Sequence, residues 1–165
     1  MSTEHGCHED FPDAPVMPVA LSEHAVLPSR AHPGDAGADL CSSQNLQIPP
    51  GGRALVPTGV SVALPEGTTG LVCPRSGLAA RHGITVLNGP GIVDSGYRGE
   101  IKVPLHNTDL DEAFEIRAGD RIAQLVIVPF VAPTLQVVDT LDTSVRADRG
   151  FGSSGGFAAT EERKH

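Results

Sequence analysis

The chain has 165 residues, a length typical of one domain with a core large enough to fold unaided. Its formal net charge of −8 argues against binding to nucleic acid or an anionic membrane, because phosphate groups attract a basic face. No stretch approaches the roughly 18 apolar residues of a transmembrane helix, and the N-terminus has no signal-peptide core. Nucleic acid and membranes are therefore not expected as partners, whereas a small anionic ligand is compatible with the arginines grouped in motifs.

The composition indicates an all-β fold. Apolar residues make up 39% of the chain and aromatic residues 4%, and the 19 glycines and 14 prolines bound many short apolar runs. Such runs, with few helical periodicities, are typical of a β-sandwich or barrel. The three cysteines, odd in number and without a pattern, favour free thiols in a reducing cytoplasm.

In chain order, residues 1–15 are polar and are expected to be a disordered lead-in. His5, Cys7 and His8 offer metal-ligand atoms there, but such residues on a terminal segment more often bind nothing. A single β-domain is predicted over residues 16–142. Its predicted strands are Val16–Val19, Arg53–Pro57, Val60–Leu64, Thr69–Val72, Ile84–Leu87, Glu100–His106, Ala113–Ile116, Arg121–Val128 and Leu135–Val138.

A short helix is predicted directly after the strand Thr69–Val72. Ser76 is the expected N-cap, residues 78–82 form the helix, and Gly83 ends it. A helix start beside Arg75 and Ser76 combines backbone donors, the helix dipole and a guanidinium. This segment therefore predicts a phosphate site, although any helix start offers part of that chemistry.

The segment Asn88–Glu100 holds four glycines, one proline, Asp94 and the chain's only tyrosine, Tyr97. The alternating run Ile101–Leu105 follows it, so the sequence predicts a β-hairpin whose backbone approaches a ligand closely. Main-chain groups would read a flat base while the Tyr97 ring packs on a sugar. Taken alone, the segment is explained best by an ordinary hairpin with a surface Asp.

From residue 143 to the end, glycine, serine and charged residues predominate, which by composition indicates a disordered tail. The segment Arg146–Gly155 within it, Arg-Ala-Asp-Arg-Gly-Phe-Gly-Ser-Ser-Gly, favours a tail that becomes ordered on a ligand. The expected organisation is thus a lead-in, a β-domain over 16–142 and a C-terminal arm over 143–165.

Five segments, in this order and at these spacings, closely resemble the trimeric dUTP pyrophosphatases (dUTPases), and the resemblance runs from about residue 17 to 156. They are Ala36–Leu40, Cys73–Gly83, Asn88–Glu100, Arg117–Leu125 and Arg146–Gly155. The resemblance implies a distorted jelly-roll β-barrel of the β-clip type with one short helix and a flexible C-terminal arm. It also implies a homotrimer whose arm closes over a neighbouring subunit's active site.

The resemblance implies that the chain hydrolyses dUTP to dUMP and pyrophosphate, which limits uracil in DNA and supplies dUMP for thymidylate synthesis. Asp94 matches the carboxylate that activates a water for attack on the α-phosphorus. Mg²⁺ is the implied cofactor, bound to the triphosphate, and Asp39 matches the residue that contacts it through water. Asp94 and Asp39 both have a plainer alternative, which is to fix a turn.

Further site residues carry over from the family's motifs. Phosphate contacts are implied for Arg75, Ser76, Gly77, Gln124, Arg146, Gly152, Ser153 and Ser154. Nucleoside contacts are implied for Asn88, Gly91, Ile92, Val93, Tyr97, Lys102 and Phe151. Main-chain groups that match uracil would leave cytosine's polar groups unpaired, and Tyr97 under the sugar would leave no room for a 2′-hydroxyl. Gln124 on an alternating strand could instead simply face solvent.

The sequence also departs from the family's pattern. Gly96 stands where many relatives have a second Asp, Ala38 stands where an aromatic is frequent, and Ala147 and Arg149 replace tail glycines. A dCTP deaminase is the nearest rival interpretation, but Pro104 occupies the position of its catalytic Glu and can neither activate water nor donate from its backbone. A non-catalytic nucleotide sensor, a structural interaction protein and a broader nucleotide pyrophosphatase are more distant rivals.

Overall fold

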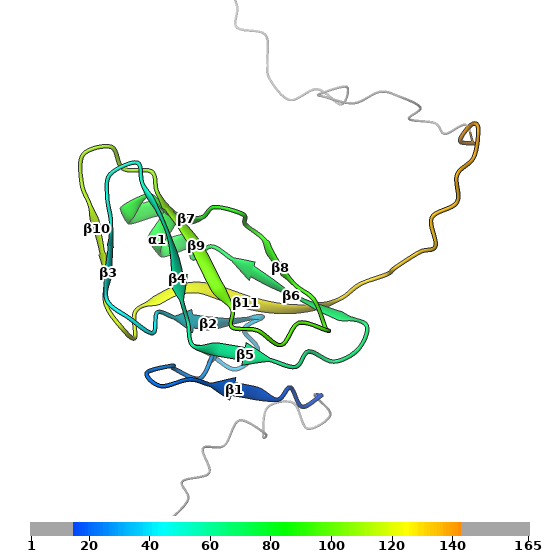
Figure 1. Cartoon of the computed structure of the whole chain (residues 1–165), viewed down its shortest axis with the longest axis horizontal. Helices are drawn as coiled ribbons and strands as arrows, with labels where there is room; N and C mark the ends of the chain where they lie inside the picture. Colours follow the sequence, from blue (N-terminus) through cyan, green and yellow to red (C-terminus); the bar gives the residue numbers. More distant parts are fainter. Residues whose placement is uncertain (1–14, 143–165) are drawn as a thin grey trace, which may run out of the picture. The chain divides into compact units, whose positions relative to one another are not determined.

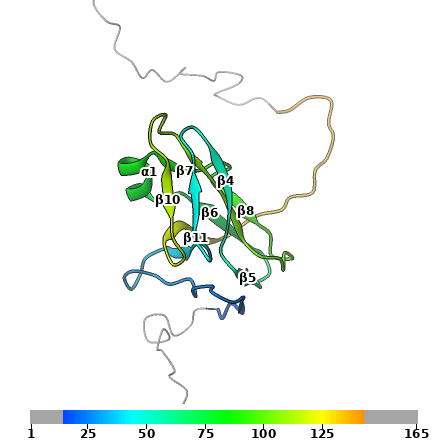
Figure 2. The same ribbon diagram turned by 60° about the vertical axis from the view of Figure 1, so that its left-hand side comes forward.

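The computed structural model describes residues 15–142 and divides the chain into two units, Met1–Val131 and Ala132–His165. In the first unit, eleven strands and one short helix form, which confirms the predicted all-β class (Figures 1 and 2). The elements are β1 (Val19–Leu21), β2 (Gly37–Cys41), β3 (Leu46–Ile48), β4 (Arg53–Pro57), β5 (Val60–Val62), β6 (Thr68–Cys73), α1 (Ser76–His82), β7 (Ile84–Val86), β8 (Gly91–Val93), β9 (Lys102–Asn107), β10 (Phe114–Ile116) and β11 (Arg121–Pro129).

The strands pair in four antiparallel sheets, as in a distorted jelly roll. The largest has the order β2-β11-β6-β8, and a second has the order β4-β9-β7. Two-stranded sheets, β1-β5 and β10-β3, complete the set. Both views place α1 beside β7, which it contacts (Figures 1 and 2). Because nonconsecutive strands become neighbours, residues far apart in the sequence meet on each sheet.

One apolar cluster joins the four sheets. In strands such as β9, alternate residues point inward: Val103 and Leu105 are completely buried between more exposed neighbours. Leu40, Val56 and Leu125 from β2, β4 and β11 join the same cluster. Each fully buried side chain of this size stabilises the fold by about 1.5–3 kcal/mol. The cluster thereby fixes the strand ends from which the site residues project.

The helix differs from the prediction at its start but not at its end. Ser76 is the first helical residue, and Arg75 in extended conformation occupies the N-cap without a side-chain cap bond, so the predicted Ser76 cap is wrong. Gly83 ends the helix as predicted, at a left-handed φ of 62° that a side chain would strain. The Arg75 side chain is used elsewhere, in an ion pair described below.

The predicted hairpin around residues 88–105 is also wrong. β8 pairs with β6, with Gly91 opposite Val72, whereas β9 pairs with β4 and β7. The connection between β8 and β9 therefore passes from one sheet to another. Its turn is closed by the Tyr97 amide, which donates to the Asp94 carbonyl at 3.0 Å. β8 and β9 each pair in a different sheet. The alternation of apolar residues along the sequence would be the same in a hairpin, so it does not distinguish the two arrangements.

Among the remaining strand predictions, Arg53–Pro57 is confirmed without change, and most others are shifted by one to three residues. Leu135–Val138 is wrong, because the structure forms no strand there and leaves Leu135 and Val137 90% and 99% exposed. β2, β3 and β8 were not predicted. Residues 1–14 of the predicted lead-in and the whole predicted arm, 143–165, lie outside the described residues.

The one helix in the described part of the chain, seven residues long, is too short to cross a membrane.

Candidate functional site

A pocket of about 190 Å³ lies where β8, the turn after it and the start of β9 come together. Seven residues predicted from the sequence line it, namely Asn88, Gly91, Ile92, Val93, Asp94, Tyr97 and Lys102. Four lining residues were not predicted as ligand contacts, namely Val72, Glu100, Ile101 and Pro104. The structure thus brings the predicted catalytic carboxylate and the described nucleoside residues into one cavity, which we call the Asp94 pocket.

The glycines of this segment let the chain approach its neighbours closely. A Cβ atom added to Gly91 would lie 3.2 Å from the Asn88 side-chain nitrogen. A larger residue at this position would therefore push the Asn88 amide away from its present position. Ile92, between Gly91 and the buried Val93, is 61% exposed and presents its backbone and side chain outward. The pocket wall is therefore built from main-chain edges and the Asn88 amide, which suits a flat polar ligand.

Two carboxylates line the pocket, and their surroundings differ. Glu100 accepts the Gly59 amide at 2.8 Å through Oε1, and its Oε2 lies 3.5 Å from the Lys102 ammonium. The Asp94 side chain is exposed and makes no hydrogen bond or ion pair within residues 15–142. Asp94 is therefore the carboxylate with free lone pairs, able to accept a hydrogen bond from a water molecule.

Tyr97 stands at the pocket with a ring that is 47% exposed. Its hydroxyl donates to the Glu100 carbonyl at 2.9 Å, so the polar end of the side chain is bonded back to the protein. The ring face is then the part offered to a ligand. An aromatic face held in this way favours packing against a sugar or a base.

A second group of charged residues, the arginine cluster, consists of Asp39, Arg75 and Arg121. Asp39 is buried, and its Oδ1 accepts Arg75 Nε at 3.0 Å while its Oδ2 accepts Arg121 Nη1 at 3.2 Å. Arg75 also donates through Nη1 to the Arg121 carbonyl at 3.1 Å. The sequence did not single out Arg121. Only the pairing of β2 with β11 brings it to Asp39, and local pattern carries no signal of that pairing.

The other phosphate residues within the described range lie near the arginine cluster. Ser76 and Gly77 begin α1, and Gln124 on β11 has Asp39 of β2 and Cys73 of β6 as its strand partners. None of the predicted phosphate residues in residues 15–142 lines the Asp94 pocket. Arg75 instead lines a separate pocket of about 300 Å³ together with Arg121, Leu78 and Phe114. Within one chain, Arg75 and the predicted nucleoside residues therefore face different cavities.

The side chains of the site give a metal ion few direct ligands. Residues 15–142 contain no group of three or more His, Cys, Asp or Glu side chains that could hold an ion. Asp39 already bonds a guanidinium through each carboxylate oxygen, so an inner-sphere contact from it would compete with an arginine. Mg²⁺ commonly takes most of its ligands from water and substrate phosphates. The described residues therefore fit an ion that arrives with the ligand's phosphates.

The remaining predicted ligands lie outside the described residues. They are Arg146, Phe151, Gly152, Ser153 and Ser154 of the arm. His5, Cys7 and His8 of the lead-in, which were expected to bind nothing, also lie outside the described residues.

The arginine cluster influences a neighbouring thiol. Burial raises the pKa of Cys41, and the nearby Asp39 carboxylate raises it further, while Arg121 and Arg75 oppose both effects. The Cys41 thiol is thus kept neutral and unreactive at physiological pH. Cys41 and Cys73 are both free thiols, as the sequence predicted for them.

Comparison with known proteins agrees with this geometry. The family model described as dUTPase matches residues 23–155. A deoxyuridine 5'-triphosphate nucleotidohydrolase of Leifsonia xyli is 54% identical over 139 residues, which cover 84% of this chain and 91% of the relative. One of Rhodococcus erythropolis is 56% identical over 132 residues and 80% of each chain.

Solved structures show the same likeness. The dUTPase of Staphylococcus bacteriophage 80alpha with dUPNHPP has a TM-score of 0.81 and 32% identity, and the match covers 87% of this chain and all of that one. A mutant dUTPase from phage phi11 of S. aureus, described for its coordination of a structural Mg(II) ion, has a TM-score of 0.72 at 30% identity. That match covers 76% of this chain and 98% of the phage protein.

Proposed function

This chain belongs to the dUTPase family, and from that premise we propose that it is a dUTP diphosphatase, which hydrolyses dUTP to dUMP and pyrophosphate. The observation that carries the proposal is the Asp94 pocket, in which Asp94 lies among the residues expected to bind a nucleoside. The reaction limits the uracil available to DNA synthesis and supplies dUMP for thymidylate synthesis.

Uracil is recognised by the strand β8 and the residues around it. The Asn88 amide and the main-chain groups of Gly91 and Ile92 line the pocket and can pair with the O4 and N3–H groups of uracil. Cytosine presents the opposite pattern of donors and acceptors and would leave these groups unpaired. Val93 and Lys102 complete the lining, and the Tyr97 ring packs under the deoxyribose.

Asp94 orients and activates the water that attacks the α-phosphorus. Its free carboxylate supports this role, because Glu100, the other carboxylate of the pocket, is engaged by Gly59 and Lys102. A carboxylate can take the water's proton as the new phosphorus–oxygen bond forms and pyrophosphate leaves. Holding the water in line with the bond that breaks lowers the barrier further.

Arg75, Ser76, Gly77 and Gln124 bind the phosphates. Arg75 is fixed by Asp39 through one nitrogen and by the Arg121 carbonyl through another, so its guanidinium plane is set before a ligand arrives. Mg²⁺ held by the substrate's triphosphate would supply charge neutralisation on the leaving pyrophosphate oxygens. Asp39 would contact its water shell while it orients Arg75.

The working enzyme is a homotrimer with active sites at its subunit interfaces. Two observations support this proposal. Arg75 and the nucleoside residues face different cavities of one chain, which supports a site that a neighbouring subunit completes. The apolar side chains of Leu135 and Val137 are also exposed, as expected for a segment that packs on another subunit.

The arm, residues 143–165, closes over the site of a neighbouring subunit. The dUTPase family match extends to residue 155 and so covers its motif. Arg146 reaches the phosphates, Phe151 stacks on uracil, and Gly152, Ser153 and Ser154 wrap the γ-phosphate. Closure excludes water other than the nucleophile. The free thiols of Cys41 and Cys73 support a cytoplasmic location for the enzyme.

Deamination is not the proposed reaction. Pro104 lines the Asp94 pocket at the position where a dCTP deaminase has its catalytic Glu, and proline offers no acid or base. A sensor that binds dUTP without hydrolysing it would need no free carboxylate at Asp94.

The test is to measure pyrophosphate release from dUTP, dCTP, dTTP and UTP, each with Mg²⁺ and with a chelator. Metal-dependent release from dUTP alone is expected. Binding of dUTP without release would contradict hydrolysis and favour a sensor, and ammonia release from dCTP would contradict the exclusion of deamination.

A further inference from the structure

The turn that carries Tyr97, residues 94–100, is tied to itself by short bonds. The Tyr97 amide donates to the Asp94 carbonyl at 3.0 Å, and the Tyr97 hydroxyl donates to the Glu100 carbonyl at 2.9 Å. Arg98 donates through Nη1 to the Ser95 carbonyl at 2.6 Å and to the Tyr97 carbonyl at 2.8 Å. The turn itself therefore fixes both the Tyr97 backbone and the hydroxyl end of its side chain, although the ring is half-exposed.

The Tyr97 ring packs directly against Gly99. A Cβ atom added to Gly99 would lie 2.7 Å from Tyr97 Cζ and 3.0 Å from Cε2, and closer still to the hydroxyl oxygen. Distances this short force the ring to move. Gly96, in the same turn, has no atom within 4 Å of an added Cβ. Neither glycine has a left-handed φ, so the need for glycine at 99 comes from the ring and not from the backbone.

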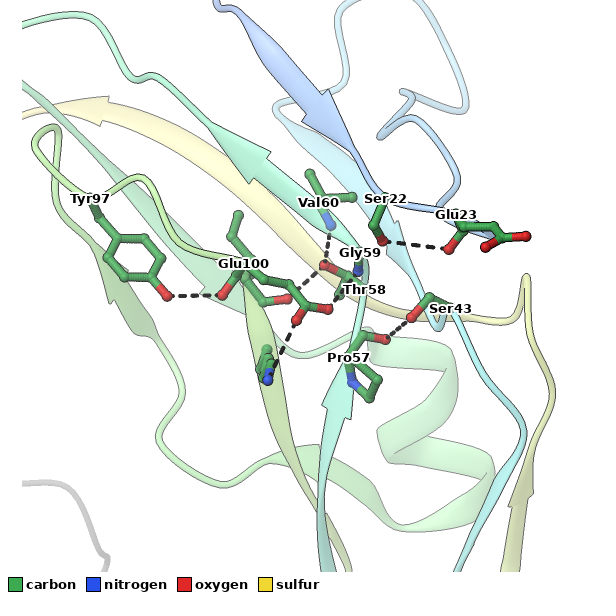
Figure 3. A network of polar contacts seen from close by, with 11 residues as sticks. Ser22, Glu23, Ser43, Pro57, Thr58, Gly59, Val60, Tyr97 and Glu100 are labelled. Atoms are coloured by element: carbon green, nitrogen blue, oxygen red, sulfur yellow. Dashed lines mark hydrogen bonds and ion pairs between the residues drawn. The ribbon is translucent and has the colours of Figure 1, made fainter.

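The end of the turn is clamped to the residues that join β4 to β5 (Figure 3). The Glu100 carboxylate accepts the Gly59 amide at 2.8 Å, and the Thr58 hydroxyl donates to the Ile101 carbonyl at 2.6 Å. The Ile101 amide donates to the Val60 carbonyl at 2.8 Å. Thr58 is fully buried, so these bonds are shielded from water. The carbonyl that receives the Tyr97 hydroxyl is thus held by a second element of the fold.

We propose that Gly99 and Glu100 are specificity-determining positioning residues, which hold the Tyr97 ring at the depth that separates deoxyribose from ribose. This inference rests on the proposed function, in which the ring packs under the sugar of dUTP. Ribose differs from deoxyribose by one oxygen atom at the 2′ position. The Tyr97 ring can exclude that atom only if the ring keeps a fixed distance from the sugar and does not rotate away from it. Gly99 sets how far back the ring lies, and the clamped Glu100 carbonyl prevents it from swinging.

Lys102 completes the arrangement from the other side. Its ammonium lies 3.5 Å from Glu100 Oε2, and it lines the Asp94 pocket with Tyr97. One carboxylate therefore joins a buried backbone amide at Gly59 to a charged group at the nucleoside. Because both oxygens of Glu100 are used in this way, its side chain acts through Tyr97 and Lys102 and does not itself take part in the reaction.

The experiment compares Gly99→Ala with Gly96→Ala, measuring kcat and KM for dUTP and UTP with the full chain and Mg²⁺. Gly99→Ala is expected to lower the preference for dUTP over UTP about tenfold or more, mainly through a lower KM for UTP, because a displaced ring no longer excludes the 2′-hydroxyl. Displacements of about an ångström have effects of this order. Gly96→Ala is expected to stay within about twofold of the parent, as an exposed substitution without contacts.

Glu100→Ala and Glu100→Gln form the second pair. The amide oxygen of glutamine still accepts the Gly59 amide, so Glu100→Gln is expected to keep most of the selectivity that Glu100→Ala loses. Circular dichroism and melting temperatures establish which variants are folded. If Glu100→Ala does not fold, the comparison of Gly99→Ala with Gly96→Ala still tests the positioning role, because Gly99 is exposed.

Tyr97→Ala separates the sugar contact from the positioning of the ring. Loss of selectivity in both Tyr97→Ala and Gly99→Ala supports the inference. Loss in Tyr97→Ala with parental selectivity in Gly99→Ala overturns the positioning role alone. Parental selectivity in Tyr97→Ala overturns the sugar contact itself, and the inference falls with it.

Discussion

Replacing Asp39 by asparagine removes the charge between Arg75 and Arg121 while it preserves the shape of the side chain. The Asp39 side chain is 9% exposed, against 23% for Arg75 and 54% for Arg121. A hydrogen bond to a charged group contributes about 1.5–3 kcal/mol, and we assign the lower part of this range to the more buried Arg75 contact, since asparagine keeps one acceptor. The half-exposed Arg121 contact adds about 0.5–1 kcal/mol, because solvent screens it.

The sum is a destabilisation of about 2–3 kcal/mol, well below the cost of breaking a fully buried ion pair. For a chain of this size, such a loss corresponds to a fall in melting temperature of about 5–10 °C. Thermal and denaturant unfolding at one fixed protein concentration measure it, since an oligomer's stability depends on concentration.

The matched control is Glu115→Gln, the same chemical change in an exposed pair. Glu115 Oε2 lies 4.0 Å from Arg117 Nη2, and the two side chains are 68% and 79% exposed. The expected effect of this control is within about 0.5 kcal/mol. Equal stability losses in the two variants would refute the reasoning, because they would show that the burial of Asp39 adds nothing to its ion pairs.

Three further predictions concern single positions. Gly83→Ala should destabilise the fold by more than Gly67→Ala, because both glycines have a left-handed φ but only at Gly83 would a Cβ also meet a side chain, Thr108 Oγ1 at 2.6 Å; equal melting temperatures would contradict this. The free energy of unfolding should fall above pH 9.0, because the Cys41 thiol ionises at its ordinary value in the unfolded chain while its pKa is raised in the folded protein. The fall should be smaller in Cys41→Ala, and denaturant titrations across alkaline pH measure the free energy of unfolding. Asp94→Asn should bind dUTP but lose most turnover, because geometry survives while the proton acceptor is lost, and near-parental turnover would remove Asp94 from the mechanism.

The fold was predictable where a short apolar run lies between turn residues. Arg53–Pro57 became β4 without change, because its apolar residues lie between Gly52 and Gly59. β2 was missed because Gly37, Ala38 and Asp39 have low strand propensity, and pairing with β11 overrides it. Leu135–Val138 shows the reverse case, an apolar run that forms no strand in the described structure.

The clustering of the residues around Asp94 was predictable, but their relation to the arginine cluster was not. The motif residues around Asp94 do line one pocket, since they follow one another along β8, its turn and β9. Arg121 and Glu100 were missed as partners because their contacts, with Asp39 and Gly59, join strands separated by dozens of residues. The division between nucleoside and phosphate residues depends on sheet topology, which local spacing does not encode.

The central claim, that a water molecule attacks the α-phosphorus of dUTP, is tested most directly by hydrolysis of dUTP in water labelled with the heavy isotope of oxygen. The oxygen of the attacking water remains on the phosphorus that it attacks. The account predicts that mass spectrometry finds one heavy oxygen in the phosphate of dUMP and none in pyrophosphate. Label in the pyrophosphate would contradict it, because the water would then have attacked the β-phosphorus.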